Sequence, residues 1–213
     1  MIRLSPDEIS FPDPRAYNPD EGIIALGGDL STERVLFAYE CGLFPWYNPT
    51  EEILWWCPDP RCVLFPQDLK ISKSMRKVFR DGVFTFTENQ CFYEVMENCQ
   101  KIKRKDEDGT WISSDFLKTY HDLHLMGIAK SVEVWQNGAL VGGFYGLIIN
   151  KIFCGESMFA HVSNASKAGF IYFVEKYKDV FSLIDCQVKT NHLVSLGATE
   201  ISKIEYLDNL DRK

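Results

Sequence analysis

Long apolar runs are missing from this sequence of 213 residues. None of its apolar stretches approaches the roughly 20 residues that a helix needs to cross a bilayer. The opening segment, MIRLSPDEISFPDP, has no unbroken apolar core of the kind found in a secretory signal. Low-complexity tracts and repeats at solenoid or propeller periods are also absent. We therefore expect a globular, cytoplasmic protein that does not enter a membrane.

The sequence also lacks paired metal ligands and a disulfide framework. Its seven cysteines are an odd number in a chain without an export signal, which indicates reduced thiols. Cys57 and Cys62 form one close pair and His121 and His124 another, but no second pair at a zinc-binding spacing joins either of them. These residues are predicted to be packing cysteines and helix-surface histidines, and no metal or other cofactor is expected.

Basic residues are outnumbered overall but concentrated in one segment. The net charge is −7, which argues against a protein that binds nucleic acid along its whole surface. Residues 1–60 carry a net charge of −8 and residues 106–213 a net charge of −4, whereas residues 61–105 carry +5. A basic island in an acidic protein fits a local phosphate contact better than a general DNA binder.

The composition permits a packed core, since 46% of the residues are hydrophobic and 14% are aromatic. The first sixty residues are rich in turns and contain one clear helix, capped by Ser31 or Thr32 and ended by Gly42. After the tract WWCPDPR, from Trp55 to Arg61, the pattern changes from turn-rich segments to alternating helices and strands. We place a boundary there, between a small N-terminal α+β domain (residues 1–60) and a larger domain (residues 61–213).

Helices and strands alternate in the second segment. The expected helices are Lys73–Arg80 with Ser72 as its cap, an apolar-faced segment over 92–102, Ser114–Met126, a helix from Ser163 or Asn164 to Lys178, and a turn at Asn191–Leu196. The expected strands are Val83–Thr87, Ile128–Trp135, Leu140–Ile149, Ile152–Phe159, Phe181–Cys186 and Ala198–Ile204, with a hairpin at Asn137-Gly138. This order predicts an α+β or α/β layout, which is compatible with a GNAT-type acyltransferase domain and with several other folds.

Four basic residues share one face of the first helix after the boundary. Lys73, Arg76, Lys77 and Arg80 follow the i, i+3, i+4, i+7 spacing. No acidic residue interleaves on that face, so it is either an ordinary solvated surface or a phosphate contact. The run KIKRK, from Lys101 to Lys105, either extends this patch or belongs to a loop.

Two tryptophans lie in segments predicted to be loops. Trp46 stands in FPWY, and Trp111 follows Gly109-Thr110 just before a helix. A loop tryptophan is most often a hydrophobic plug. It can also be a stacking platform for an unpaired base, such as one at a single-stranded terminus.

Polar residues interrupt two apolar strands of the predicted sheet. Glu156 lies within FCGESMF beside Gly155, and a carboxylate in such a run is costly unless it is paired or used. Asp185 ends the apolar strand of LIDCQ, and the period of two places Gln187 on the same face. Three glycines in GGFYG, from Gly142 to Gly146, indicate a bulge or a close backbone approach. A site that combines these polar residues is one interpretation, and structural pairing with a core arginine is the other.

Eight short motifs occur in order: FPWY, WWCPDPR, GTWI, VGGFYG, FCGESMF, NASK, DCQ and SLGA. Together they resemble the leucyl/phenylalanyl-tRNA–protein transferase family, and the resemblance extends from Gly27 to the SLGA motif at Ser195. It implies a small N-terminal domain followed by a GNAT-like domain. It also implies an enzyme that takes Leu or Phe, and less well Met, from aminoacyl-tRNA. The amino acid is attached to proteins that begin with Arg or Lys, which marks them for degradation.

The resemblance also implies roles for individual residues. Glu156 is suited to hold the basic N-terminal residue of the acceptor, and Asp185 and Gln187 are implicated at the amine and the ester. Trp46 and Trp111 are placed near the terminal adenosine, and the basic helix becomes the acceptor-stem contact. An apolar pocket for the transferred side chain is implied at Phe144, Phe153, Gly155, Met158, Phe173 and Ile184.

The sequence departs from the family pattern at two positions. Phe144 stands where the family often has Met, and Ala160 where it often has Ser. A bulkier ring at position 144 narrows the pocket, so the preference among Leu, Phe and Met is left open. The reaction class is not affected.

The expected chemistry needs positioning more than a strong base, because an aminoacyl ester is already activated and the acceptor α-amine has a pKa of about 7.7–8.0. We predict that Asp185, oriented with Gln187, receives the amine proton. A covalent route through Cys154 or Cys186 lacks an evident paired histidine. The alternatives are an acetyl-CoA-dependent acetyltransferase and a non-enzymatic tRNA-binding module. A monomer is expected, since no surplus apolar stripe is evident.

Overall fold

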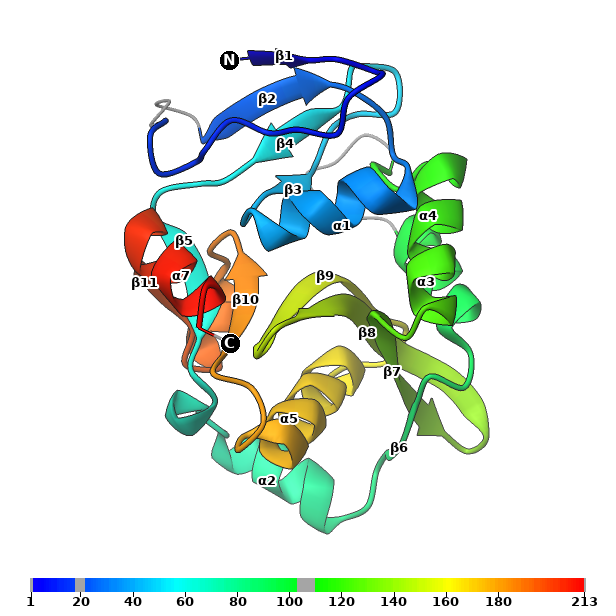
Figure 1. The fold of residues 1–213 in the computed structure, drawn as a ribbon. Helices are drawn as coiled ribbons and strands as arrows, with labels where there is room; N and C mark the ends of the chain where they lie inside the picture. Colours follow the sequence, from blue (N-terminus) through cyan, green and yellow to red (C-terminus); the bar gives the residue numbers. More distant parts are fainter. Residues whose placement is uncertain (1, 18–21, 103–109, 213) are drawn as a thin grey trace.

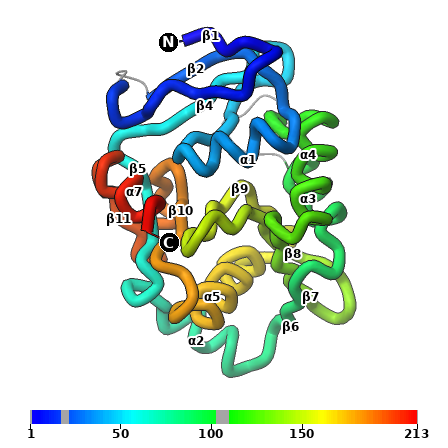
Figure 2. The backbone as a smooth tube through the Cα atoms, in the orientation of Figure 1, coloured from blue at the N-terminus to red at the C-terminus, as the bar shows by residue number. Residues whose placement is uncertain are grey.

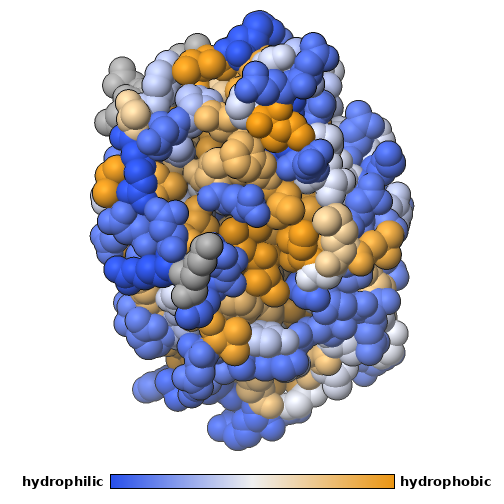
Figure 3. All heavy atoms as spheres, viewed as in Figure 1, coloured by the Kyte–Doolittle hydropathy of each residue, from blue (hydrophilic) through white to orange (hydrophobic). Residues whose placement is uncertain are grey.

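The computed structural model describes residues 2–17, 22–102 and 110–212, which form two β-sheets and seven α-helices (Figure 1). None of the helices in these ranges is long and apolar enough to cross a membrane. Apolar residues gather across the middle of the face seen in Figure 3, and hydrophilic residues surround them. The predicted α+β class is confirmed, and the structure adds that a small sheet precedes a larger one.

The first sheet has the strand order β1-β2-β4-β3. Its strands are short: β1 (Ile2–Leu4), β2 (Ile23–Gly27), β3 (Phe44–Pro45) and β4 (Leu54–Trp56). Helix α1 (Thr32–Glu40) connects β2 to β3, and the side chain of Ser31 caps it by accepting a hydrogen bond from the backbone N–H of Arg34. The predicted helix is therefore confirmed, whereas the four strands around it were not predicted.

The second sheet has the strand order β11-β5-β10-β9-β8-β7-β6. Its strands are β5 (Arg61–Leu64), β6 (Thr85–Glu88), β7 (Ala129–Gln136), β8 (Ala139–Ile149), β9 (Ile152–Ala160), β10 (Leu183–Gln187) and β11 (Thr199–Ile201). All neighbours are antiparallel except β9 and β10, which α5 (Ala165–Tyr177) connects as a crossover helix. Asn164 precedes α5, but its side chain makes no capping hydrogen bond.

Helices cover both faces of the second sheet, and glycines in β8 let them approach. A Cβ atom on Gly142 would lie 2.7 Å from Cβ of Ala165 in α5. On the neighbouring Gly143, which faces the other way, it would lie 2.7 Å from the carbonyl oxygen of Val132 in β7 and 3.4 Å from Val95 in α3 (Phe92–Lys101). The predicted close backbone approach is confirmed, and a register shift beside Gly146 adds the predicted bulge. Helix α4 (Ser114–Leu125) packs beside α3, and α2 (Lys73–Arg80) packs against α5.

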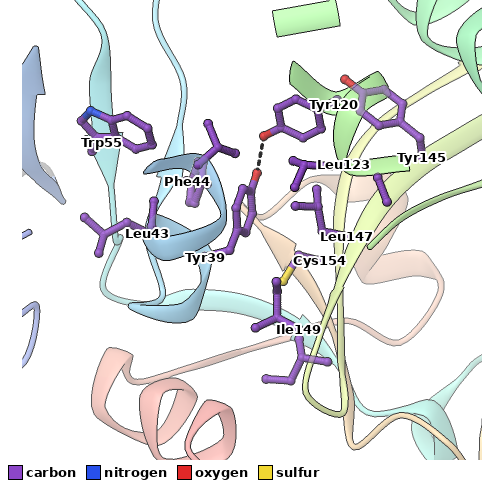
Figure 4. Packing of buried hydrophobic residues seen from close by; sticks show 14 of the residues in the cluster. Tyr39, Leu43, Phe44, Trp55, Tyr120, Leu123, Tyr145, Leu147, Ile149 and Cys154 are labelled. Atoms are coloured by element: carbon purple, nitrogen blue, oxygen red, sulfur yellow. Dashed lines mark hydrogen bonds between the residues drawn. The ribbon is translucent and has the colours of Figure 1, made fainter. Parts of the chain in front are cut away.

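One hydrophobic cluster joins the two sheets. It includes Leu43 and Trp55 of the N-terminal part together with Leu147 and Ile149 of β8 (Figure 4). Helix α7 (Lys203–Leu210) lies beside β5 and β11 and closes this cluster at the C-terminal end (Figure 2). Gly42 has φ +82°, and a Cβ atom there would lie 2.5 Å from Leu207 in α7. The N-terminal part and the second sheet therefore share a core.

The chain after residue 198 differs from the prediction. The expected strand Ala198–Ile204 is only three residues long, because Ser202 ends it and caps α7 by accepting a hydrogen bond from the N–H of Glu205.

A second, separate cluster of buried residues packs α5 against the opposite face of the second sheet. The short α6 (Asn191–Ser195), close to its predicted position, precedes β11.

Candidate active site

A pocket of about 380 Å³ lies where β9 and β10 meet the N-terminal part of the chain. Nearly all of the predicted site residues outside the basic helix line it: Trp46, Trp111, Phe144, Phe153, Gly155, Glu156, Met158, Ile184, Asp185 and Gln187. The structure thus brings together residues from positions 46 to 187 of the chain. Its walls are largely apolar, and the two carboxyl groups that line it are those of Glu156 and Asp185.

The apolar wall is built from rings that support one another. Phe144 and Phe153 meet edge to face, with ring centroids 5.9 Å apart. Phe173 was predicted to line the pocket but does not. It is buried behind Phe153, with ring centroids 4.5 Å apart, because α5 turns it toward the cluster between helix and sheet. Phe170, one turn earlier on α5, takes the lining position instead.

Glu156 lies half-buried in the pocket and is held on two sides. Its Oε1 accepts a hydrogen bond of 2.9 Å from Nε2 of Gln187, and its Oε2 accepts one of 3.4 Å from the hydroxyl of Tyr120. The hydroxyls of Tyr120 and Tyr39 lie 2.7 Å apart (Figure 4). Burial raises the pKa of Glu156 to about 8, although the hydrogen bond from Tyr39 opposes this shift. The carboxyl group can therefore exchange a proton near neutral pH.

Asp185 is held by an arginine that the sequence did not single out. Nε of Arg61 donates to one oxygen of Asp185 at 2.8 Å, and Nη2 donates to the other at 2.6 Å. The hydroxyl of Tyr206 adds a third hydrogen bond of 3.0 Å. Both side chains of the ion pair are 0% exposed. This bidentate geometry is the strong form of an arginine–carboxylate pair, and it engages both oxygens of Asp185.

Arg61 also connects the two parts of the chain. Its Nη1 donates to the carbonyl of Gly42 at 3.3 Å, and its guanidinium carbon lies 4.7 Å from the ring centroid of Phe44 in β3. The ring of Tyr206 in α7 contacts it at 4.3 Å. These contacts satisfy the buried cation with an anion, a carbonyl and two aromatic faces.

A β-bulge separates Asp185 from Gln187. In the pairing with β5, Asp185 is opposite Val63 and Gln187 is opposite Cys62, so Cys186 is the extra residue. Gln187 has φ +60°, and its backbone N–H donates to Oδ1 of Asp185 at 2.9 Å. The predicted alternation is interrupted there, and yet both residues line the pocket. Asp185 thus fixes the backbone that aims Gln187 at Glu156.

The two predicted tryptophans both line the pocket. Trp46 is 39% exposed, and its ring centroid lies 5.5 Å from that of Trp56. Trp111 is half-buried and meets Phe116 edge to face at 5.0 Å. Each ring is therefore braced from behind by a second aromatic ring while it borders the pocket.

The basic helix is separate from the pocket. Lys73, Arg76, Lys77 and Arg80 are exposed on α2, and none of them lines the pocket. The predicted helix and its Ser72 cap are confirmed. Lys103 to Lys105 of the KIKRK run lie outside the described residues, as does Gly109.

Sequence reasoning missed Arg61, Tyr206, Tyr39 and Tyr120. Arg61 and Asp185 are 124 residues apart, so no spacing rule relates them. Tyr206 was detectable, because with Leu207 and Leu210 it forms the apolar face of a helix that begins at Ser202. None of the seven cysteines, all of which lie in the described part of the chain, forms a disulfide. Among the residues that the structure describes, no group of three or more His, Cys, Asp or Glu side chains is arranged to hold a metal ion.

Comparisons with known proteins agree with this arrangement. The N-terminal domain model of leucyl/phenylalanyl-tRNA protein transferases matches residues 28–59, and the main model of that family matches residues 63–211. A leucyl/phenylalanyl-tRNA–protein transferase of Flavobacterium johnsoniae is 51% identical over 207 residues, which cover 97% of each chain. One from Klebsiella pneumoniae is 45% identical over 212 residues, covering 99% of this chain and 89% of the relative.

Solved structures give weaker similarities. L-PGS from Bacillus licheniformis is 13% identical with a TM-score of 0.44, covering 72% of this chain and 56% of that one. A GCN5-related N-acetyltransferase-like protein from Streptococcus suis is 13% identical with a TM-score of 0.40, covering 68% and 58%. Neither similarity is strong enough to carry an argument.

An apolar pocket that ends in a carboxyl group, in a chain that matches transferase models along most of its length, defines an aminoacyltransferase. The donor class for such an enzyme is aminoacyl-tRNA, and the acceptor class is protein. The chain belongs to the leucyl/phenylalanyl-tRNA–protein transferase family.

Proposed function

We propose that the chain transfers Leu or Phe, and less readily Met, from aminoacyl-tRNA to the α-amine of proteins that begin with Arg or Lys. The observation that carries this proposal is the continuity of the pocket. Apolar walls at Phe144, Phe153 and Met158 end at Glu156 and Gln187, and Trp46 and Trp111 border the same space. An apolar side chain, an ester and a terminal base can thus be placed next to one another.

The donor end is assigned to the apolar wall and the tryptophans. A Leu or Phe side chain is buried among the rings of Phe144, Phe153 and Phe170, which removes apolar surface from water. The terminal adenine stacks on Trp46 or Trp111, a contact worth about 1–3 kcal/mol per base. The exposed basic face of α2 is proposed to contact phosphates of the tRNA acceptor stem.

The acceptor end is assigned to Glu156. Two carboxyl groups line the pocket, and Arg61 neutralises Asp185, whereas Glu156 accepts hydrogen bonds from neutral side chains, Gln187 and Tyr120. An approaching cationic N-terminus favours the ionised form of Glu156, which then supplies its counter-charge. The preference for Arg or Lys as the acceptor residue is supported by this carboxylate and by the family resemblance.

The proton of the acceptor amine is assigned to Glu156 rather than to Asp185. Glu156 has a pKa of about 8, which matches an α-amine at about 7.7–8.0. Asp185 already accepts hydrogen bonds from Arg61, Tyr206 and the Gln187 backbone. The amine nitrogen attacks the ester carbonyl carbon and its proton passes to Glu156. The C–O bond to the ribose then breaks, and the ribose oxygen leaves with that proton.

Asp185 and Gln187 are assigned to positioning. The Gln187 side-chain amide donates to Glu156 and orients it, while Asp185 fixes the Gln187 backbone. Stabilisation of the ester's developing oxyanion needs preorganised donors, and the Gln187 amide is the nearest candidate. The product is proposed to be a protein marked for degradation by its new apolar N-terminus, made in the cytoplasm by a monomeric enzyme.

Two other functions make different predictions. An acetyl-CoA-dependent enzyme needs a pyrophosphate cradle, but the segment that enters α5, HVSNASKAG, lacks a glycine-rich turn. A purely tRNA-binding module explains the basic helix and the tryptophans. It does not explain why a series of hydrogen bonds in the pocket connects Arg61, Asp185, Gln187 and Glu156.

The donor side is tested by charging tRNA with radiolabelled Leu, Phe or Asp and offering each to one peptide that begins with Arg. We expect label on the peptide from Leu and Phe and none from Asp, because the pocket wall is apolar. Retention of tRNA by the protein without transfer from any donor would favour the tRNA-binding module. Binding of coenzyme A with acetylation of the peptide would favour the acetyltransferase.

A further inference from the structure

We propose that Cys62 and Cys186 form an oxidation-sensitive thiol pair whose disulfide switches off the transferase site. This adds regulation to the proposed function and rests on it for the activity readout, but not for the chemistry of the pair. The two cysteines lie on neighbouring strands, Cys62 in β5 and Cys186 in β10.

The bulge in β10 brings the two side chains to the same place. Cys186 and Gln187 together oppose Cys62, since Asp185 pairs with Val63 and Gln187 with Cys62. Cys62 belongs to the hydrophobic cluster under α5, and Cys186 packs against that same cluster. Their neighbours Arg61 and Asp185 pair with each other on the opposite face of the sheet.

The two thiols are in direct contact. A hydrogen bond between the two sulfurs lowers the pKa of Cys62 and raises that of Cys186, and the S–H group of Cys186 also lies 3.7 Å from the carbonyl oxygen of Ile184. Burial instead raises the pKa of Cys41 to about 11 and that of Cys91 to about 12. Since the thiolate is the reactive form, its lowered pKa distinguishes Cys62 from these two partly exposed cysteines.

A small oxidant reaches the pair through the pocket. Cys186 is partly exposed and lines the pocket, whereas Cys62 is 1% exposed and lies behind it. Hydrogen peroxide, which is little larger than water, is the oxidant class that fits this access. The arrangement is that of a reacting thiol with a resolving thiol beside it.

The reaction balances with peroxide as the two-electron acceptor. The sulfur of Cys186 attacks one peroxide oxygen, the O–O bond breaks, and the sulfur becomes a sulfenic acid while the thiol proton leaves in water. The sulfur of Cys62 then attacks the sulfenic sulfur. The S–S bond forms, the S–O bond breaks, and the hydroxyl group leaves with the Cys62 proton as a second water. Thiol reductants reverse the step by exchange.

The disulfide acts on catalysis through the bulge. Cys186 stands between Asp185 and Gln187, and an S–S bond of about 2.05 Å draws it closer to β5 than a hydrogen bond does. The bulge holds Gln187 at φ +60° with its amide 2.9 Å from Glu156. A shift of about 1 Å at such a site costs roughly 100-fold in rate.

The test treats the full-length protein and the variants Cys62→Ala and Cys41→Ser with hydrogen peroxide and maps peptides by mass spectrometry. The parent and Cys41→Ser should yield a peptide in which Cys62 and Cys186 are linked. Their rate of Leu transfer should fall at least tenfold, and dithiothreitol should restore that rate. Cys62→Ala should yield no linked peptide and keep its transfer rate at the same dose.

Three results would overturn the proposal: no linked peptide in the parent, a linked peptide with undiminished transfer, or equal losses in Cys62→Ala and the parent. A reduced parent that never transfers Leu would count against the proposed function alone. The linked peptide would still decide whether the thiols are paired.

Discussion

At the scale of single residues, Glu156 couples the pocket to pH. Its pKa of about 8 in the folded protein lies above its ordinary value of 4.5, and burial is the main cause. The native state therefore binds more protons than the unfolded chain between about pH 4.5 and 8, and stability falls as the pH rises through that window. Below this pH window Glu156 is protonated, and its burial lowers the free energy of unfolding very little. Above the window the buried group is ionised, and the free energy of unfolding is lowered by the full desolvation penalty.

Replacing Glu156 by Gln should remove this dependence. Between pH 5.5 and 8.5 the parent should lose on the order of 1–3 kcal/mol of unfolding free energy more than Glu156→Gln, since one pKa unit corresponds to about 1.4 kcal/mol and the pocket is partly open to water. Urea unfolding at the two pH values measures the difference. Glu175→Gln, on the exposed side of α5, should behave as the parent does, and an equal loss in all three proteins would refute the assignment.

Arg61 is the second residue with a large expected effect. Arg61→Met leaves Asp185 buried without its cation, so we expect about 3–5 kcal/mol of destabilisation. The matched control is Arg3→Met, which breaks an exposed ion pair with Glu52 and should leave the free energy of unfolding nearly unchanged. Chemical denaturation measures both. Equal, small losses in the two variants would mean that the buried pair contributes little.

At the scale of elements, α2 is expected to act on tRNA binding and not on the chemical step. Reversing the charge of Lys73 and Lys77 to Glu should raise KM for Leu-tRNA by tenfold or more at low salt, leave kcat within twofold, and flatten the dependence of KM on salt. The reason is that the face is exposed and none of its residues lines the pocket. The exposed Lys118→Glu on α4 serves as the control, and a fall in kcat alone would contradict this role.

The elements also differ in how far the sequence predicts them. Helix α2 was predicted with both its bounds, because Ser72 caps it, Gly82 follows it and its polar face is continuous. Strand β5 was missed, since RCVL is only four residues long and is buried on both faces, so it has no alternation. Helix α7 was missed even though Ser202 and Glu205 have the spacing of a capping box.

At the scale of the whole molecule, the two sheets share one core, and we expect them to unfold together. Residues on both sides of the predicted boundary near residue 60 belong to the same cluster, and Arg61 bridges Gly42, Asp185 and Tyr206. Urea transitions followed by tryptophan fluorescence and by circular dichroism should therefore coincide. Two separate transitions would mean that residues 1–60 form an independent unit.

The pocket illustrates what sequence can and cannot predict at this scale. Ten predicted residues line it. They could be predicted because each belongs to a short sequence motif whose residues lie close together in the structure. Phe173 was misplaced, since its direction depends on how α5 packs on the sheet. The ion pair between Arg61 and Asp185 joins residues 124 positions apart, which no local pattern encodes. The proposal that Glu156 rather than Asp185 accepts the amine proton rests on this contact.

The most direct test of the account offers Leu-tRNA to two peptides that differ only in their first residue, Arg or Asp, using the parent and Glu156→Gln. The account predicts label on the Arg peptide alone with the parent, and a loss of at least tenfold with Glu156→Gln, because that variant has neither the counter-charge nor the proton acceptor. Equal labelling of both peptides, or full activity in Glu156→Gln, would contradict the assignment of the acceptor end to Glu156.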